Sequence, residues 1–134
     1  PDVNIDELEK AGEVLMYRKA WDYIKSIDLN KECLNIRKNL FGEQHNLTWV
    51  SLNNLALNYS MIEDWESSKN INQKLLNDKL SLLGENNESF ILSLSNLSVD
   101  YTSLSQYDSS IFILKQAYFL IVKNKLQMLL YDLY

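Results

Sequence analysis

The sequence predicts an all-α fold in which similar helix pairs stack one after another as a solenoid. The first observation is a 42-residue repeat, which returns Gly42, Leu52, Leu55 and Tyr59 as Gly84, Leu94, Leu97 and Tyr101. The second is that apolar residues recur three and four positions apart, which indicates helices with one apolar face. The third is that only three Gly and one Pro interrupt 134 residues. Self-similarity at such a period is typical of a solenoid rather than of a single globular core.

The composition disfavours several classes of function. The net charge is −5 and the pI is about 4.8, whereas phosphate backbones and anionic lipid surfaces both require a basic face. We therefore expect no nucleic acid and no membrane as a partner. The single Cys cannot form an intrachain disulfide, which favours a reducing compartment, and we expect a cytoplasmic location. Because the chain starts at Pro1 and not at Met, we also expect a fragment of a longer protein.

In the first unit, at about residues 7–42, we expect two helices. A frayed end over residues 1–6 would be followed by a helix beginning near Glu7, with Asp6 as a candidate N-cap. Arg18-Lys19 forms a short polar break before a second helix, which opens at Trp21 and Tyr23. Gly42 is expected to end that helix, because Gly is the usual residue in the left-handed position after a helix.

The second and third units, at about residues 49–84 and 91–126, repeat this plan. Asn46 or Thr48 is a candidate N-cap for the first helix of the second unit, and residues 62–64 form the turn before a helix from Trp65 to Gly84. In the third unit Leu126 stands where Gly84 stands, so we expect its last helix to continue as an extension over residues 126–134. The prediction is six helices in three pairs within one domain.

At these residues the chain resembles the tetratricopeptide repeat, in its 42-residue form typical of kinesin-light-chain-like repeats. The resemblance covers about residues 8–125. The first helix of the second unit carries the signature Leu52, Leu55, Ala56 and Tyr59. An aromatic residue, Trp65, opens the second helix, the small residue Ser68 follows three positions later, and Leu83-Gly84-Glu85 ends the unit. The resemblance implies a right-handed α-α superhelix of three helix-turn-helix units plus an extended C-terminal helix. The connector at residues 41–45 is also similar to the Leu-Gly-Glu-x-His-Pro connector of that family.

The first helix of the first unit departs from the pattern, and two registers stay open. In one register Tyr17 corresponds to Tyr59, but Glu13 then falls where Leu55 falls. In the other, Leu8, Ala11, Gly12 and Leu15 form the signature, and a longer turn follows. Terminal repeats are often atypical in this way.

The resemblance implies a non-catalytic scaffold that binds a peptide or a helix of a partner protein in a concave groove. The groove-facing positions that it implies are mostly amides and small or apolar residues: Asn53, Asn54, Leu57, Met61, Ser95, Asn96, Val99 and Ser103. Asn54 and Asn96 stand where related repeats bond the backbone of a bound peptide, and an amide can both donate and accept. The alternative is that these are solvated helix-surface residues in an Asn-rich chain.

The sequence offers little for catalysis or for a metal. With one His and one Cys, no Cys/His zinc site can be built within the chain, and three scattered Gly cannot form a phosphate-binding loop, so we expect no cofactor. We expect no enzyme activity, because no group in the sequence is a strong candidate for catalysis. His45 falls at a connector position with a structural role in the family, and Cys33 falls at a core-facing slot that predicts a buried, inert thiol. A groove for an acidic C-terminal tail is disfavoured, because the first-type helices of the second and third units carry no Lys or Arg, and Arg18 and Lys19 of the first unit fall at its expected turn.

Two other functions remain as alternatives. The repeats would form a regulatory or sensor segment if the parent protein carries its chemistry elsewhere. They would instead form a self-associating structural array if Leu129, Leu130 and Leu133 of the C-terminal helix are exposed, because large exposed apolar patches usually mark contacts. A homo-oligomer formed through this helix is therefore a further expectation.

Overall fold

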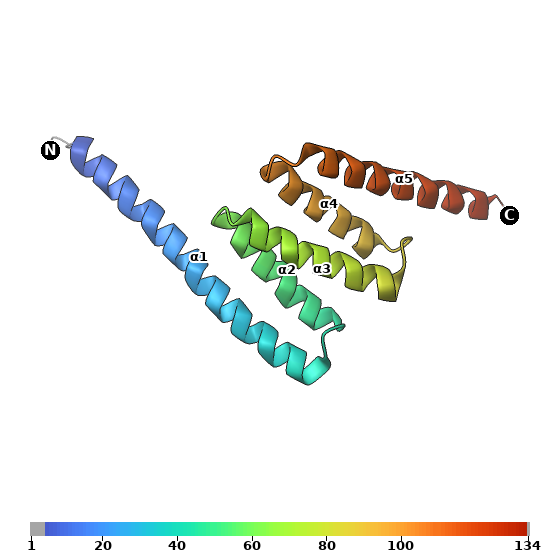
Figure 1. The fold of residues 1–134 in the computed structure, drawn as a ribbon, viewed down its shortest axis with the longest axis horizontal. Coiled ribbons are helices and arrows are strands. Elements are labelled where there is room, and N and C mark those ends of the chain that lie inside the picture. The colour runs from blue at the N-terminus through green and yellow to red at the C-terminus, as the bar shows by residue number, and fades with distance from the viewer. Residues whose placement is uncertain (1–4, 134) are drawn as a thin grey trace.

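The computed structural model consists of five α-helices, each packed against the next, and describes the backbone of residues 5–133 and the side chains of residues 19–133 (Figure 1). The helices are α1 (Ile5–Phe41), α2 (Asn46–Met61), α3 (Trp65–Leu83), α4 (Glu88–Ser103) and α5 (Tyr107–Asp132). Within residues 5–133 there is no β-strand. The predicted all-α solenoid is confirmed.

The first unit is not a helix pair, and the prediction of a break at Arg18-Lys19 is wrong. Residues 5–41 form one continuous helix, so five helices replace the expected six. The reason lies at the turn between the two helices of a unit. In the second and third units this turn contains a residue with positive φ, Glu63 (62°) and Ser105 (60°). The position one repeat before Glu63 is Trp21. A bulky residue rarely adopts positive φ, and Arg18-Lys19-Ala20 favours helix.

The prediction of Asp6 as an N-cap is wrong, because α1 begins at Ile5, two residues before Glu7, and Asp6 already lies within the helix. The frayed end predicted for residues 1–6 falls partly on residues 1–4, outside the described residues. The side chains of the apolar face at Leu8, Ala11 and Leu15, and of Tyr17, are likewise outside them.

The ends of the helices follow local signals. Gly42 (φ 89°) and Gly84 (φ 77°) lie in the left-handed region and end α1 and α3, as predicted. Asp64 caps α3, because its Oδ1 accepts a hydrogen bond from the backbone N–H of Ser67 at 3.2 Å. With Leu126 in place of a Gly, α5 continues to Asp132, which confirms the expected extension.

The N-cap of α2 is His45, not Asn46 or Thr48 as predicted. The Nδ1 of His45 accepts a hydrogen bond from the backbone N–H of Leu47 at 3.1 Å, and its ring stacks on Phe41 with 4.6 Å between centroids. Asn46 is the first residue of the helix, and Thr48 is buried, with its Oγ1 donating to the Gly42 carbonyl at 2.8 Å. These contacts hold the connector at residues 41–48 against the start of α2.

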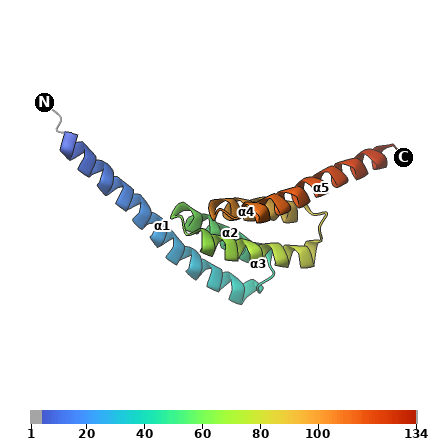
Figure 2. The same ribbon diagram turned by 45° about the horizontal axis from the view of Figure 1, so that its top comes forward.

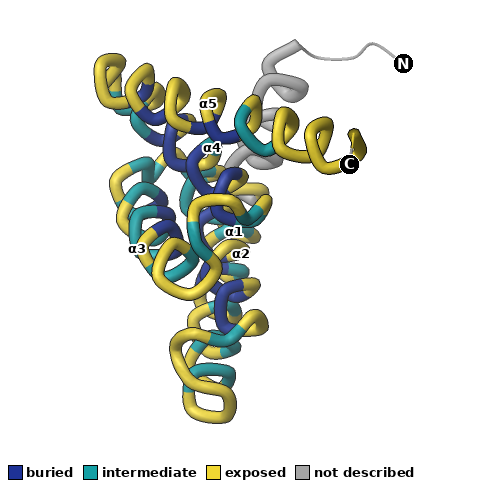
Figure 3. The backbone as a smooth tube through the Cα atoms, turned by 90° about the vertical axis from the view of Figure 1, so that its right-hand side faces the viewer, coloured by how far each residue is buried: buried dark blue, intermediate teal, exposed yellow. Residues whose placement is uncertain are grey.

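The core lies between consecutive helices (Figure 3). Its larger cluster joins α3, α4 and α5 around the fully buried Leu97, and a smaller cluster joins Trp49, Leu52 and Leu75. Trp49 is buried and Trp65 is half-buried, whereas Trp21, which stands near the start of the second helix expected for the first unit, is exposed. The exposure of Trp21 follows from the continuous α1.

The sequence repeat is visible in the contacts between units. The Nη1 of Arg37 donates to the Oγ of Ser51 at 2.9 Å, and one repeat later the Nζ of Lys79 donates to the Oγ of Ser93 at 3.0 Å. The first pair joins α1 to α2 and the second joins α3 to α4. The second part of α1 therefore packs on α2 as α3 packs on α4. Figure 2 shows that α1 and α5 project beyond the central helices at opposite ends.

Candidate functional site

A cleft of about 300 Å³ lies between α2 and α4, with α3 as its floor. It combines apolar and polar side chains from three helices: Asn53, Ala56, Leu57, Ser60, Trp65, Ser68, Asn72, Asn96, Val99 and Asp100. The two helices that form its walls are the first helices of the second and third units. The cleft is therefore built by stacking one unit on the next and belongs to neither alone.

The walls of the cleft carry two exposed amides and two exposed apolar side chains. Asn53 and Leu57 come from α2, one helical turn apart, and Asn96 and Val99 come from α4. The spacings of three and four positions place each pair on one side of its helix. Each wall thus offers both a hydrogen-bonding group and an apolar surface.

The floor of the cleft is a buried polar network centred on Asp100. The Oδ1 of Asp100 accepts from the Oγ of Ser68 at 2.8 Å, and its Oδ2 accepts from the Nδ2 of Asn72 at 2.6 Å. Asp100 is only 2% exposed and forms no salt bridge within the described side chains. Two neutral donors therefore satisfy its two oxygens, while its charge has no directly paired cation.

Burial raises the pKa of Asp100 above its ordinary value. The hydrogen bonds from Asn72 and Ser68 and the positive charge of Lys69 act in the opposite direction, because they favour the carboxylate. The Nζ of Lys69 lies 2.7 Å from Glu66, so its charge is shared with another acid. Desolvation is the larger effect.

The eight groove positions implied by the resemblance divide into two sets. Asn53, Leu57, Asn96 and Val99 line the cleft. Outside its lining, Asn54, Met61 and Ser103 are exposed and Ser95 is half-buried. The structure thus brings together four of the eight positions.

Sequence reasoning missed Asp100 and Asn72 at the floor. A signal was present, because Asp100 is an acid on a helix whose preceding turns bury Leu94 and Leu97. An acid at an inward position of such a helix requires a hydrogen-bonding partner. The identity of that partner depends on how α3 packs on α4, which the pattern alone does not show.

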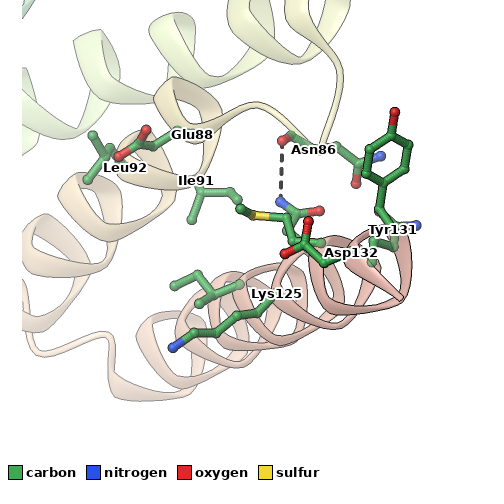
Figure 4. Close-up of a pocket in the computed structure, with 11 residues that line it drawn as sticks. Asn86, Glu88, Ile91, Leu92, Lys125, Tyr131 and Asp132 are labelled. Atoms are coloured by element: carbon green, nitrogen blue, oxygen red, sulfur yellow. Dashed lines mark hydrogen bonds between the residues drawn. The ribbon is translucent and has the colours of Figure 1, made fainter. Parts of the chain in front are cut away.

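A larger hollow, of about 810 Å³, opens where α5 runs past the start of α4 (Figure 4). The Nδ2 of Asn124 donates to the Asn86 carbonyl at 3.3 Å across its edge. Ile121 in its lining corresponds to Lys79, which contacts α4. By the repeat register, this hollow therefore lies on the side of α5 that a following first-type helix would cover.

The other two candidate residues from the sequence, His45 and Cys33, make contacts that support the fold. His45 caps a helix, and its Nδ1 is occupied. Cys33 is half-buried, not fully buried as predicted, and its Sγ lies 3.7 Å from the Oγ of Ser51. The part of the chain that the structure describes contains no group of three or more His, Cys, Asp or Glu placed to hold a metal ion. No helix among these residues is long and apolar enough to cross a membrane.

Comparison with known proteins gives one family. The family model described as tetratricopeptide repeat matches residues 14–81, which is half of the chain and runs from α1 to the last turn of α3. No curated protein matches the chain.

Proposed function

The chain belongs to the tetratricopeptide repeat family, and from this we propose that it is a non-catalytic scaffold that holds an extended peptide or a helix of a partner protein in the cleft between α2 and α4. The family generally mediates protein–protein interactions. The observation that carries the proposal is the combination of amides and apolar side chains on both walls of one cleft, at Asn53, Leu57, Asn96 and Val99.

The chemistry of the walls suits a peptide whose sequence varies. The Asn53 and Asn96 amides can each donate to a backbone carbonyl and accept from a backbone N–H. Leu57 and Val99 provide apolar surface for side chains on either side of that backbone. At the floor, an Asp100 carboxylate without a directly paired cation favours a partner side chain with N–H donors over an acidic one.

A peptide-library selection followed by calorimetric titration tests the proposal. The selected peptide is titrated against wild type, Asn53→Ala, Asn96→Ala and the double variant, with Asn70→Ala as the control because Asn70 is an exposed amide of α3 outside the cleft. Each lost hydrogen bond costs about 1 kcal/mol, so we expect the Kd to rise about fivefold per single variant. Unchanged binding in the double variant, or no enriched peptide, would contradict the proposal.

We also propose that the units are kinesin-light-chain-like 42-residue repeats, and that they reside in a reducing, cytoplasmic environment. The repeat form is supported by the matched contacts Arg37–Ser51 and Lys79–Ser93, which are one repeat apart. The compartment is supported by the lone Cys33. Chemical labelling of Cys33 in protein isolated without reductant tests the compartment, since a free thiol is the expected result.

Two alternatives rest on other features. Self-association through the C-terminal helix is supported by the exposure of Leu129, Leu130 and Leu133 at the end of α5. A regulatory role within a larger protein would leave the cleft as the contact for another domain of the same parent. Self-association predicts a mass that rises with concentration, whereas the regulatory role predicts that selected peptides compete with an intramolecular contact.

A further inference from the structure

One face of α1 is apolar and uncovered, although the equivalent face of α5 is buried. Leu29 and Ile36 are 67% and 54% exposed. The equivalent positions two repeats later are Ile113 and Leu120, which are 8% and 6% exposed in the core between α4 and α5. In the third unit, the first helix of the unit covers these positions. In the first unit, no helix of the described chain covers them.

The cause is the continuous α1, which prevents its first part from folding back on its second part. At 1.5 Å per residue, its 37 residues span about 55 Å, whereas the 16 residues of α2 span about 24 Å. The described contacts of α1 are with α2, on the side that carries Arg37. The first part of α1 therefore extends past α2, and Figure 1 shows it pointing away from the other helices.

In one of the two registers that the sequence allows, this first part of α1 matches a first-type helix. Leu8, Ala11, Gly12 and Leu15 have the same spacing as Leu52, Leu55, Ala56 and Tyr59 in α2. The chain therefore contains both an open site and a segment of the pattern that fills such a site in the other two units. Within one copy the straight helix keeps the two apart.

We propose that two copies of the chain exchange these segments and form a two-fold dimer. The α1 helices run antiparallel, and residues 5–17 of each copy cover the face of Leu29 and Ile36 on the other. The direction is right, because the two helices of a helix-turn-helix unit are themselves antiparallel. The arrangement also closes on itself, as two-fold contacts do, so it predicts a dimer and not a filament.

The charges of the two surfaces are complementary. Residues 5–17 carry four acids and one Lys. Residues 21–41 carry four basic residues, Lys25, Lys31, Arg37 and Lys38, and three acids. Complementary charge favours the correct pairing and orientation of a contact. The exchanged contact would thus place an acidic segment on the more basic part of α1.

Trp21 disfavours the fold-back: counted back from Tyr23, which corresponds to Trp65, it stands at the position that takes positive φ in the equivalent turn, at Glu63. A Gly at this position would permit that turn, since Gly adopts positive φ without a steric penalty. The segment at residues 5–17 could then fold onto its own copy. The dimer and the folded-back monomer therefore compete for the same surface.

The test is the mass of the chain in solution over a concentration series, by sedimentation equilibrium. Wild type is expected to be a dimer, and Leu29→Glu/Ile36→Glu to raise the dimer Kd about 100-fold or more, because charges would enter an apolar contact. Both side chains are exposed within one copy, so the variant should keep its helical content. The matched control is Leu82→Glu, a 50% exposed Leu of α3 outside both the contact and the cleft, which should leave the dimer intact.

A second pair of variants separates exchange from simple side-by-side contact. Trp21→Gly should be monomeric and Trp21→Ala dimeric, because both lack the indole but only Gly permits the turn. A monomeric wild type overturns the proposal. So does a dimer that survives Leu29→Glu/Ile36→Glu but is lost in Leu129→Glu/Leu130→Glu, which would place the contact on α5. Equal dimerisation of Trp21→Gly and Trp21→Ala overturns the exchange.

Discussion

Replacing Asp100 by Asn removes the buried charge at the floor of the cleft and keeps the shape of the side chain. In wild type, the two carboxylate oxygens accept from the Oγ of Ser68 at 2.8 Å and the Nδ2 of Asn72 at 2.6 Å. In the variant, one acceptor oxygen remains, and a flip of the Asn72 amide would present an oxygen to the new NH2 group. The network can therefore be rebuilt without moving a helix.

The expected change in the free energy of unfolding follows from counting the hydrogen bonds that each substitution keeps or removes. Because Asn retains at least one of the two hydrogen bonds, we expect Asp100→Asn to change the free energy of unfolding at pH 7 by at most about 1 kcal/mol. Asp100→Ala removes both acceptors and leaves two buried donors, which cost about 1–3 kcal/mol together after partial compensation by the Asn72–Ser68 contact at 3.5 Å. Urea unfolding followed by circular dichroism measures both values.

The pH dependence of the free energy of unfolding tests the direction of the pKa shift of Asp100. Burial raises the pKa of Asp100 above its ordinary value, so the folded state binds this proton more tightly than the unfolded state. The resulting stabilisation is fully present below the unfolded pKa of about 3.9 and is lost as the pH rises through the folded pKa. The stability of wild type relative to Asp100→Asn should therefore fall as the pH is raised from about 4.

Unfolding curves of wild type and Asp100→Asn at matched pH values between about 4 and 7.5 measure how the difference in their free energies of unfolding changes with pH. If wild type gains stability relative to Asp100→Asn as the pH rises, the hydrogen bonds and Lys69 outweigh desolvation, and the reasoning about the floor of the cleft is refuted. A flat difference would also refute it, because it requires equal pKa values in the folded and unfolded states.

Substitutions at four further positions test the fold by urea unfolding. Leu97→Ala, in the centre of the larger core cluster, should cost about 2–5 kcal/mol, whereas Leu57→Ala on the exposed wall should cost less than about 0.5 kcal/mol; equal effects would contradict the assigned core. Gly84→Ala should cost about 1 kcal/mol through its φ of 77° alone, because an added Cβ meets no atom within 4 Å; a stabilised variant would argue against this conformation. Asp64→Ala should cost about 1 kcal/mol through loss of the cap on Ser67, and Asp64→Asn should restore most of that loss.

The second and third units were predictable because their signals are local. Gly84 ends α3 through the conformation of a single residue, and α3 begins at Trp65, directly after the turn predicted at residues 62–64. The apolar spacing around Leu55 and Leu97 identifies the buried side of each helix, because that side repeats with the helical period. Signals of this kind do not depend on the rest of the fold.

The continuous α1 was not predicted, because Arg18-Lys19 was read as a polar break. Polar residues do not end a helix by themselves, and both are good helix formers. The informative comparison was between Trp21 and the positive-φ residues Glu63 and Ser105 of the equivalent turns, and their φ values are known only from the structure. The same holds for Asp100, whose partners Ser68 and Asn72 come from another unit.

The cleft between α2 and α4 is the proposed binding surface, and NMR shift mapping tests this central claim most directly. Backbone amide shifts of the chain are followed while a selected peptide is added. We predict that the largest shifts fall on residues 53–60 of α2 and 96–100 of α4, with residues 68–72 of α3 beneath them. Shifts confined to the hollow beside α5, around Ile121 and Met128, with residues 53–60 unchanged, would contradict it.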